Sequence, residues 1–383
     1  MARFKLLLVV GTANDIFIYN MAKWLKNSME IDIDVYEFFP ASQQSYGTEY
    51  YNQLISAPQC NVRYLKTLIN PIIQGKVLDV FLRDKQYDVI HLHWITASHV
   101  MAKAYKQHCK KLFMTFWGRE YANMSICLSN KLYRKHLNRV ASTADCIINS
   151  NVSLQRIKSE LPTFRGALRE GGFGSGPLEA LYDLMDKESK EESKRILGFP
   201  AKKLSVMIGY SGKRLHQHLD IIRELNKYEE LKNKVHLFAP MTRGADNDYT
   251  KKVHRALEGS GFSYTILKGY FLTDEEVGRI RNATDIVLQL STTDGFSNSI
   301  IECLCGKAVM IYGDWLNYSD YLKKAKFQAI CVASISESIK MLTVVAQNMG
   351  DYSKISALNS ENGRHRAFWS ERIHDWVDAY NEL

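Results

Sequence analysis

Short apolar runs of strand length alternate with helix-forming segments along most of the chain, and this alternation limits the possible folds more than any other feature. The runs are rich in branched residues and several end at a glycine, as residues 4–10 end at Gly11 and residues 203–208 at Gly209. Such runs are typical of strands that are buried on both faces of a parallel sheet. Strands that alternate with helices predict an α/β fold with parallel sheets.

The alternation occurs twice, which predicts two Rossmann-like domains, and the length of 383 residues fits two cores better than one. In the first series we expect strands at 4–10, 31–38, 88–93, 111–116 and 144–149, with helices at 15–27 and 77–82. In the second we expect strands at 203–208, 235–238, 264–267, 285–290 and 308–312, with helices at 218–228, 249–259, 274–282 and 299–305.

The joining and terminal segments complete the domain prediction. A glycine-rich stretch at 164–177 and a charged helix at 183–194 are interpreted as the connection between residues 1–170 and residues 195–363. The last predicted helix, 367–380, carries enough apolar surface to dock on another domain.

Composition excludes several classes of protein. The hydrophobic fraction is 46% and the charged fraction 24%, which are typical of a globular chain. The apolar run near the amino terminus is too short for a signal peptide or a membrane span. The seven cysteines include no CxxC pair. We therefore expect a cytoplasmic protein without a metal site.

The segment 294–307, DGFSNSIIECLCGK, joins a predicted buried strand to a helix and brackets the turn with Asp294 and Glu302. The first N–H groups of a helix and its dipole favour an anion. Two carboxylates beside a phosphate site suit a ligand that combines sugar hydroxyls, a diphosphate and a ribose. The alternative is structural: Ser299 and Glu302 have the spacing of a capping box.

Polar and glycine residues also follow the predicted strands of the first domain. Ligands of parallel sheets bind beyond the carboxyl ends of the strands. The residues at such ends are Gly11, His91, His93, Trp117, Gly118 and Asn151. Asp32 and Asp34 alternate with apolar residues, so we interpret them as the polar face of a strand rather than as metal ligands.

The formal net charge of +9 is concentrated between His99 and Arg139. That stretch contains nine lysines and arginines against the single acid Glu120, with aromatic residues between them. Such a surface attracts nucleic acid, anionic lipid or a phosphorylated substrate, or is a solvated basic face without a partner.

The carboxyl half resembles the retaining GT-B glycosyltransferases, notably glycosyltransferase family 4. The family motif is an acidic residue, Gly-Phe, five more residues and Glu, followed by Cys-Gly or a similar pair. Here it reads 294–302 and then Cys305-Gly306, and the likeness extends to YDVIHLHW at 87–94 and ADCIINSN at 144–151. The resemblance implies two domains that face each other across a cleft, a carboxyl-terminal helix (364–383) that packs back on the amino-terminal domain, and no metal or other cofactor.

The resemblance also implies roles for individual residues. Asp294 would contact hydroxyls of the donor sugar, Glu302 would hold the ribose, and the loop 209–214 would supply cations to the diphosphate. The chain departs from the family there, because Tyr210 stands where an Arg is usual; Lys213 and Arg214 are the substitutes, and Asp294, Lys213 and Arg214 form the predicted catalytic set. The other predicted donor-binding residues are Gly295, Phe296, Ser297, Asn298, Ser211, Gly212, His218, Gly11, Asn14, Trp117 and Gly118.

Trp117-Gly118 is a second departure, because the family commonly has His-Gly there to contact the terminal hydroxymethyl group of the sugar. A deoxy sugar would suit this change. A patchy likeness to the 4-acetamidofucosyl transferases, in 117–118, 211–212 and 240–249, points the same way.

These observations predict transfer of a hexose-type sugar from a nucleoside diphosphate to a hydroxyl of a lipid-linked or oligosaccharide acceptor in surface polysaccharide synthesis, at the inner face of an anionic plasma membrane. A sugar-nucleotide epimerase of the same fold is one alternative. A basic nucleic-acid-binding protein is another, but it gives Asp294 and Glu302 no purpose, so no nucleic-acid partner is expected.

Overall fold

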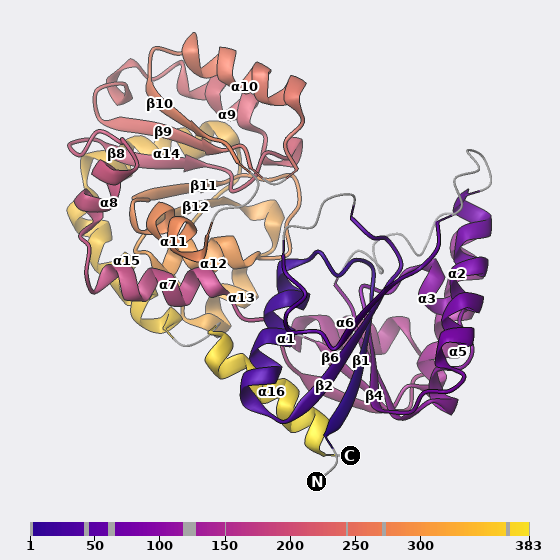
Figure 1. Cartoon of the computed structure of the whole chain (residues 1–383). Helices are drawn as coiled ribbons and strands as arrows, with labels where there is room; N and C mark the ends of the chain where they lie inside the picture. Colours follow the sequence, from indigo (N-terminus) through magenta and orange to yellow (C-terminus); the bar gives the residue numbers. More distant parts are fainter. Residues whose placement is uncertain are drawn as a thin grey trace. The chain divides into compact units, whose positions relative to one another are not determined.

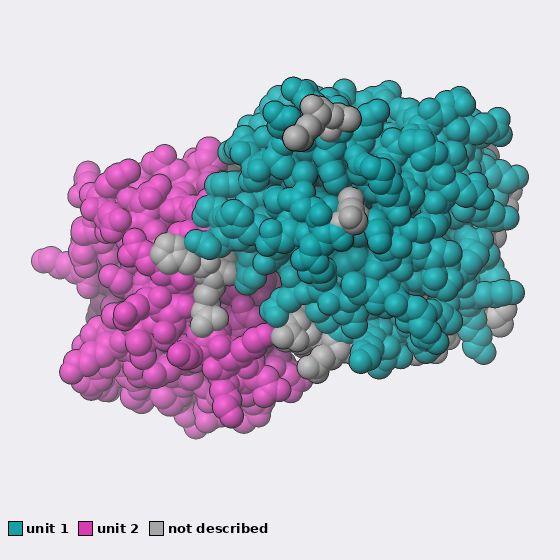
Figure 2. All heavy atoms as spheres, turned by 90° about the horizontal axis from the view of Figure 1, so that it is seen from below, with its two compact units in different colours: residues 1–174, 369–383 teal, residues 175–368 magenta. Residues whose placement is uncertain are grey.

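The computed structural model describes residues 3–41, 46–59, 66–117, 128–149, 151–242, 244–269, 273–364 and 368–382. The chain forms two compact units, distinguished by colour in Figure 2. Unit 1 comprises Met1–Gly174 and Trp369–Leu383, and unit 2 comprises Ser175–Phe368. Each contains one parallel sheet with helices on both faces, so the predicted fold class is confirmed.

Unit 1 is built on a seven-stranded sheet in the order β3-β2-β1-β4-β5-β6-β7. Its strands are β1 (Phe4–Val10), β2 (Ile31–Glu37), β3 (Gln53–Ser56), β4 (Tyr87–His93), β5 (Cys109–Thr115), β6 (Cys146–Asn149) and β7 (Ala167–Glu170). Its helices are α1 (Ile16–Ser28), α2 (Lys66–Leu82), α3 (Ala97–Met101), α5 (Leu128–Thr143), α6 (Asn151–Glu160) and α16 (Trp369–Asn381).

The apolar residues of β1 explain the two layers of helices in unit 1. Leu7 and Val9 pack on one face, in the core shared with α2, α3, α5 and α6. Leu6 and Leu8 pack on the other, with α1 and α16. A strand that is buried on both faces has no polar positions, which is why the central run FKLLLVV is almost wholly apolar.

Unit 2 repeats the design with a six-stranded sheet in the order β10-β9-β8-β11-β12-β13. Its strands are β8 (Leu204–Ile208), β9 (Val235–Pro240), β10 (Ser263–Leu267), β11 (Ile286–Gln289), β12 (Val309–Gly313) and β13 (Ile330–Val332). Its helices are α7 (Gly176–Met185), α8 (Lys190–Ile196), α9 (His218–Leu225), α10 (Asn247–Glu258), α11 (Asp274–Asn282), α12 (Asn298–Cys305), α13 (Ser319–Ala325), α14 (Ile335–Gln347) and α15 (Met349–Gly363).

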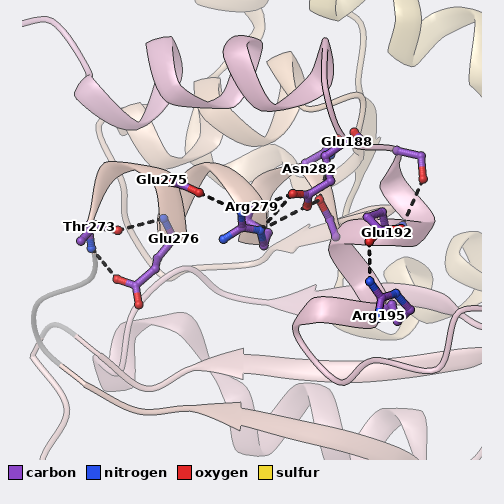
Figure 3. A network of polar contacts seen from close by, with 10 residues as sticks. Glu188, Glu192, Arg195, Thr273, Glu275, Glu276, Arg279 and Asn282 are labelled. Carbon is purple, nitrogen blue, oxygen red and sulfur yellow. Dashed lines mark hydrogen bonds and ion pairs between the residues drawn. The ribbon is translucent and has the colours of Figure 1, made fainter.

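Polar contacts fix α11, the helix that leads into β11. Thr273 and Glu276 form a capping box at its start, with Oγ1 of Thr273 accepting from the backbone N–H of Glu276 at 3.1 Å. Near its end, the Arg279 guanidinium lies between Glu188 and Glu275, at 3.2 and 2.9 Å (Figure 3). This network ties α11 to the segment between α7 and α8.

The structure corrects two predictions about the joining region. The stretch 164–177 is not only a connection, because β7 within it pairs with β6 in the sheet of unit 1. The charged segment 183–194 is not one helix: α7 ends at Met185, and α8 begins at Lys190 after the N-cap Ser189. Both α7 and α8 belong to unit 2.

Candidate functional site

The sheet of unit 2 has its topological switch point between β8 and β11, where the direction of strand order reverses. Open α/β sheets bind ligands beyond the carboxyl ends of the strands at such a point. The loops that follow the two strands meet there: the Tyr210 hydroxyl donates to Asp294, and the backbone N–H of Thr292 donates to the Leu215 carbonyl at 2.8 Å. The structure therefore brings the predicted loop 209–214 against the predicted acidic motif.

The loop after β8 turns at Gly209, whose φ is +62°. A Cβ at this position would lie 2.7 Å from the Cβ of His216, so the loop has room for glycine only. His216 contacts the Ser211 hydroxyl through Nε2 at 2.8 Å and the Ser291 hydroxyl through Nδ1 at 2.7 Å. Burial lowers the pKa of His216 to about 4, so its ring is neutral at pH 7.

The two predicted cations of this loop lie in different environments. The Arg214 guanidinium is 3.0 Å from the Asp246 carboxylate and stacks over the Tyr249 ring. Lys213 is exposed and lies against Gly244, and among the described residues no carboxylate is within ion-pair distance of it. Lys213 is therefore the better placed of the two to meet an anionic ligand.

His218 is buried at the start of α9, where its Nδ1 lies 3.2 Å from the Tyr249 hydroxyl. Burial lowers its pKa to about 3, so it is neutral at pH 7 and supplies no positive charge to the site. Within the described residues its Nε2 has no hydrogen-bond partner.

Asp294 organises the turn after β11. Its Oδ2 accepts from the backbone N–H groups of Phe296 and Ser297 at 3.1 and 3.2 Å, and from the Tyr318 hydroxyl. The sequence suggests that the first N–H groups of this turn face a ligand, but Asp294 accepts from two of them. The donors left for an anion are those of Asn298 and Ser299, in the first turn of α12, for which a helix has no internal partner.

Three further features of this turn are typical of a ligand-binding site. Gly295 is exposed, and no atom lies within 4 Å of where its Cβ would be. The hydroxyl of Ser297, the N-cap residue of α12, is buried without a hydrogen-bond partner in the described part of the chain. Phe296 has a φ of +62°, a conformation that a non-glycine residue keeps only where its surroundings hold it, here by packing on Tyr318 and Tyr321.

Glu302 lies in the second turn of α12 and is 5% exposed. Its Oε1 accepts from the Ser175 hydroxyl at 2.7 Å and its Oε2 from Nε of Arg281 at 3.1 Å. The capping-box alternative is wrong, because the N-cap of α12 is Ser297, Ser299 lies inside the helix, and the carboxylate of Glu302 is bound elsewhere.

Gly212 lies in the loop after β8, where a Cβ would come 2.3 Å from the Cβ of Ala245. The other predicted residues that the structure describes, Gly11, Asn14 and Trp117, lie in unit 1, at the carboxyl edge of its sheet. Gly11 follows β1 and packs against Trp94, whose ring stacks on Trp117 with centroids 6.1 Å apart. The Asn14 side chain accepts from the backbone N–H of Tyr46 at 3.3 Å. Gly118 lies outside the described residues.

Sequence reasoning missed several residues that shape the site. They are His216, Ser291, Gln289, Tyr318 and Arg281, all buried and all in contact with a predicted residue or with one another. One sequence feature pointed to this part of the site: Tyr210 stands where the resemblance implies a cation, and its ring packs on His216.

Two absences concern the described residues alone. No group of three or more His, Cys, Asp or Glu side chains among them could hold a metal ion. None of the helices described is both long and apolar enough to cross a membrane.

Neither a protein-family model nor a curated protein sequence matches the chain. Solved structures match over its full length. Sucrose-phosphate synthase from Thermosynechococcus elongatus has a TM-score of 0.77 at 11% identity, covering 100% of this chain and 99% of that chain. HepE from Anabaena, in complex with UDP and glucose, has a TM-score of 0.67 at 14% identity, covering 99% and 100%.

WaaG, described as a glycosyltransferase involved in lipopolysaccharide biosynthesis, has a TM-score of 0.65 at 12% identity, covering 99% of both chains. The fold of this chain is therefore that of the GT-B glycosyltransferases, as the motif resemblance predicts. At these identities the structural similarity establishes the fold, and the reaction has to be inferred from the residues of the site.

Proposed function

We propose that the protein is a glycosyltransferase that moves a hexose-type sugar from a nucleoside-diphosphate donor to a hydroxyl of an acceptor. The observation that carries the proposal is the junction of the Asp294 turn and the Tyr210 loop at the switch point of unit 2. A carboxylate, an open glycine and the start of a helix meet there, which suits a ligand with both hydroxyl groups and phosphates. The complexes of HepE with UDP and with UDP-glucose support this choice of donor class.

Each group has a role in this proposal. Asp294 accepts hydrogen bonds from sugar hydroxyls and orients the ring. Lys213, the Ser297 hydroxyl and the first N–H groups of α12 meet the charge that develops on the leaving diphosphate. Glu302, held by Arg281, faces the ribose. In a retaining reaction the acceptor attacks the face from which the diphosphate leaves, so we assign no protein base.

A thermal-shift panel of UDP, GDP and dTDP tests the proposal, because a ligand that binds only the folded state stabilises it. We expect one of the three to raise the unfolding temperature of the wild type. The Lys213→Ala variant should lose most of this shift because it lacks the cation that has no carboxylate partner in the described part of the chain. The Lys252→Ala variant, which removes an exposed lysine of α10, should keep it. A folded protein that responds to none of the three nucleotides would contradict the proposed function.

We further propose a lipid-linked or oligosaccharide acceptor at an anionic membrane surface. Three cations of the basic stretch 99–139 form ion pairs with acidic residues of unit 1 that lie outside this stretch. The pairs are Lys106 with Asp145, Lys110 with Asp88, and Arg134 with Glu160. The exposed cations without an acidic partner among the described residues include Lys103, Lys131 and Lys135, and Leu132 on α5 is 56% exposed beside the last two. Cations around an exposed leucine suit an anionic lipid surface.

Sedimentation with liposomes of anionic and of zwitterionic lipid tests the membrane proposal. Reversing Lys103, Lys131 and Lys135 to Glu should abolish binding to the anionic liposomes. Reversing Lys202, Lys251 and Lys252 of unit 2 changes the net charge equally and should leave binding largely intact. Equal loss in both triple variants would show that net charge alone drives the association.

A further inference from the structure

Exposed apolar side chains are concentrated on one helix of unit 1. Ile72, Ile73 and Val80 of α2 are 48%, 38% and 55% exposed. The other exposed large apolar side chains of the described residues lie at most one to a helix or strand. Single exposed apolar residues are normal on a protein surface, whereas a group of them marks a surface that binds something.

The three residues belong to one stripe along α2. Positions 69, 72, 73, 76 and 80 hold Leu, Ile, Ile, Lys and Val, and the spacing i, i+3, i+4, i+7, i+11 places them on one side of a helix. The opposite side carries Leu78 and Leu82, which are buried in the core of unit 1. α2 is therefore apolar on its outer side as well as on its inner side, whereas an ordinary surface helix is polar on the outside.

The outer sides of α2 and α5 belong to the same surface. Leu82 of α2 and Leu137 of α5 pack in one core, on the same face of the sheet, and α3 contacts both helices (Figure 1). On α5, Lys131, Leu132 and Lys135 are exposed. The apolar stripe of α2 and these residues of α5 therefore face away from the sheet on one side of unit 1.

The exposed charges of this surface are mainly positive. Lys76 lies within the apolar stripe, and the sequence of α5 contains no acidic residue. Asp79 is half-buried, and its Oδ1 accepts from the backbone N–H groups of Lys103 and Ala104 at 2.8 and 2.9 Å. Asp84 lies beyond the last residue of α2. A second copy of the chain on this surface would bring like charges together, whereas an anionic lipid surface complements them.

We propose that α2 lies in the interface of an anionic lipid bilayer, with Ile72, Ile73 and Val80 inserted at the boundary between head groups and acyl chains. This contact rests on the proposed membrane association and adds an apolar anchor to its lysines. Salt screens the attraction of exposed lysines to lipid phosphates, but it does not weaken the burial of apolar side chains. Binding that includes α2 therefore persists at a salt concentration that removes purely electrostatic binding.

Sedimentation with liposomes of phosphatidylglycerol and phosphatidylcholine, at about 0.1 M and about 0.5 M NaCl, tests the inference. The wild type should bind at both salt concentrations. The triple variant Ile72→Gln, Ile73→Gln, Val80→Gln should bind at least about tenfold more weakly at the higher one, because three apolar side chains no longer enter the lipid. Gln favours helices and the replaced side chains are exposed, so the unfolding temperature and the thermal shift from the nucleotide should not change.

The matched control replaces three exposed apolar residues of unit 2, Ile196, Val344 and Leu358, by Gln, and should bind liposomes as the wild type does. If the control loses as much binding as the α2 variant, a general loss of apolar surface is responsible and the inference is wrong. A wild type that binds only at the lower salt concentration, or an α2 variant that binds as tightly as the wild type at both, would limit the association to charge and would also overturn it.

Sedimentation velocity without lipid tests the other occupant of this surface, a second copy of the chain. A wild type that dimerises and an α2 variant that does not, with equal liposome binding, would assign the stripe to a contact between copies. A wild type that binds no liposomes would overturn the inference together with the proposed membrane association. The thermal shift from the nucleotide is measured on the same proteins, so a failure of the glycosyltransferase proposal is recognised separately from a failure of the α2 contact.

Discussion

At the residue scale, the site depends on side chains that the fold has taken out of water. Glu302 and Arg281 form an ion pair in which the side chains are 6% and 7% exposed. Removing one partner of such a pair leaves the other charge buried and costs about 3 to 5 kcal/mol. A Glu302→Ala variant would therefore confound loss of ligand with loss of folding, which is why Lys213, exposed and unpaired within the described residues, is the better probe.

Four buried histidines predict a loss of stability in mild acid. Burial lowers the pKa of His93, His99 and His218 to about 3 and that of His216 to about 4, whereas an unfolded histidine has a pKa of about 6.5. Below pH 6.5 the unfolded chain binds more protons than the folded one. Stability is thus fully present above pH 6.5 and is lost as the pH falls toward 4.

Denaturant unfolding at pH 7.5 and pH 5 measures this effect. Each histidine can contribute up to about 2 kcal/mol of destabilisation at pH 5. Carboxylates with lowered pKa values, such as Asp88 and Asp246, act mainly below pH 4.5 and fall outside this window. Equal unfolding free energies at the two pH values would show that these histidines are not buried in the neutral form.

At the element scale, the strands with an apolar run were predictable, including the edge strand β10, whereas the edge strands β3, β7 and β13 were not. The runs at β1, β8 and β11 are fully buried at their centres, so their composition reveals them. The edge strand β3 and the edge strand β7 are largely exposed, and their sequences QLIS and ALRE carry no apolar run. Their assignment depends on pairing with a neighbour, which a local pattern does not contain.

Part of the candidate site was identified from the sequence, and part was not. The motif around Asp294 and the glycine loop after β8 were identified from sequence, because turn residues and spacing are local signals. Tyr318 and Arg281 were not, since each reaches Asp294 or Glu302 from more than 20 positions away in the chain. Contacts of this kind follow from how the strands are ordered in the sheet.

The loop after β8 gives a prediction at this scale. Gly209→Ala places a Cβ on a backbone with φ of +62° and 2.7 Å from His216. We expect a loss of at least about 1 kcal/mol in unfolding free energy, together with a weaker thermal shift from the nucleotide. Gly350→Ala in α15 is the matched control: its Cβ meets open space in a helix, so the unfolding free energy should stay the same or rise. Equal effects of the two substitutions would mean that the loop relaxes around the added methyl group.

At the scale of the whole molecule, unit 1 is discontinuous: α16 returns to it after the whole of unit 2. Trp376 of α16 is 1% exposed in the core beneath β1, and its Nε1 donates to the Gly172 carbonyl at 3.0 Å. Tyr380 adds a hydrogen bond from α16 to His91 of β4, at 2.7 Å. The last helix thus completes the core of the first domain, as the resemblance implies.

This architecture predicts that the two units respond differently to one substitution. Trp376→Ala leaves a cavity in the core of unit 1 and should cost about 3 to 5 kcal/mol. In differential scanning calorimetry we expect the transition of unit 1 to move to lower temperature, while the transition stabilised by the nucleoside diphosphate, assigned to unit 2, keeps its midpoint. His374→Ala, on the exposed face of the same helix, should change neither transition. If Trp376→Ala lowered both transitions equally, the units would unfold as one cooperative body, and the helix would support the nucleotide site as well as its own domain.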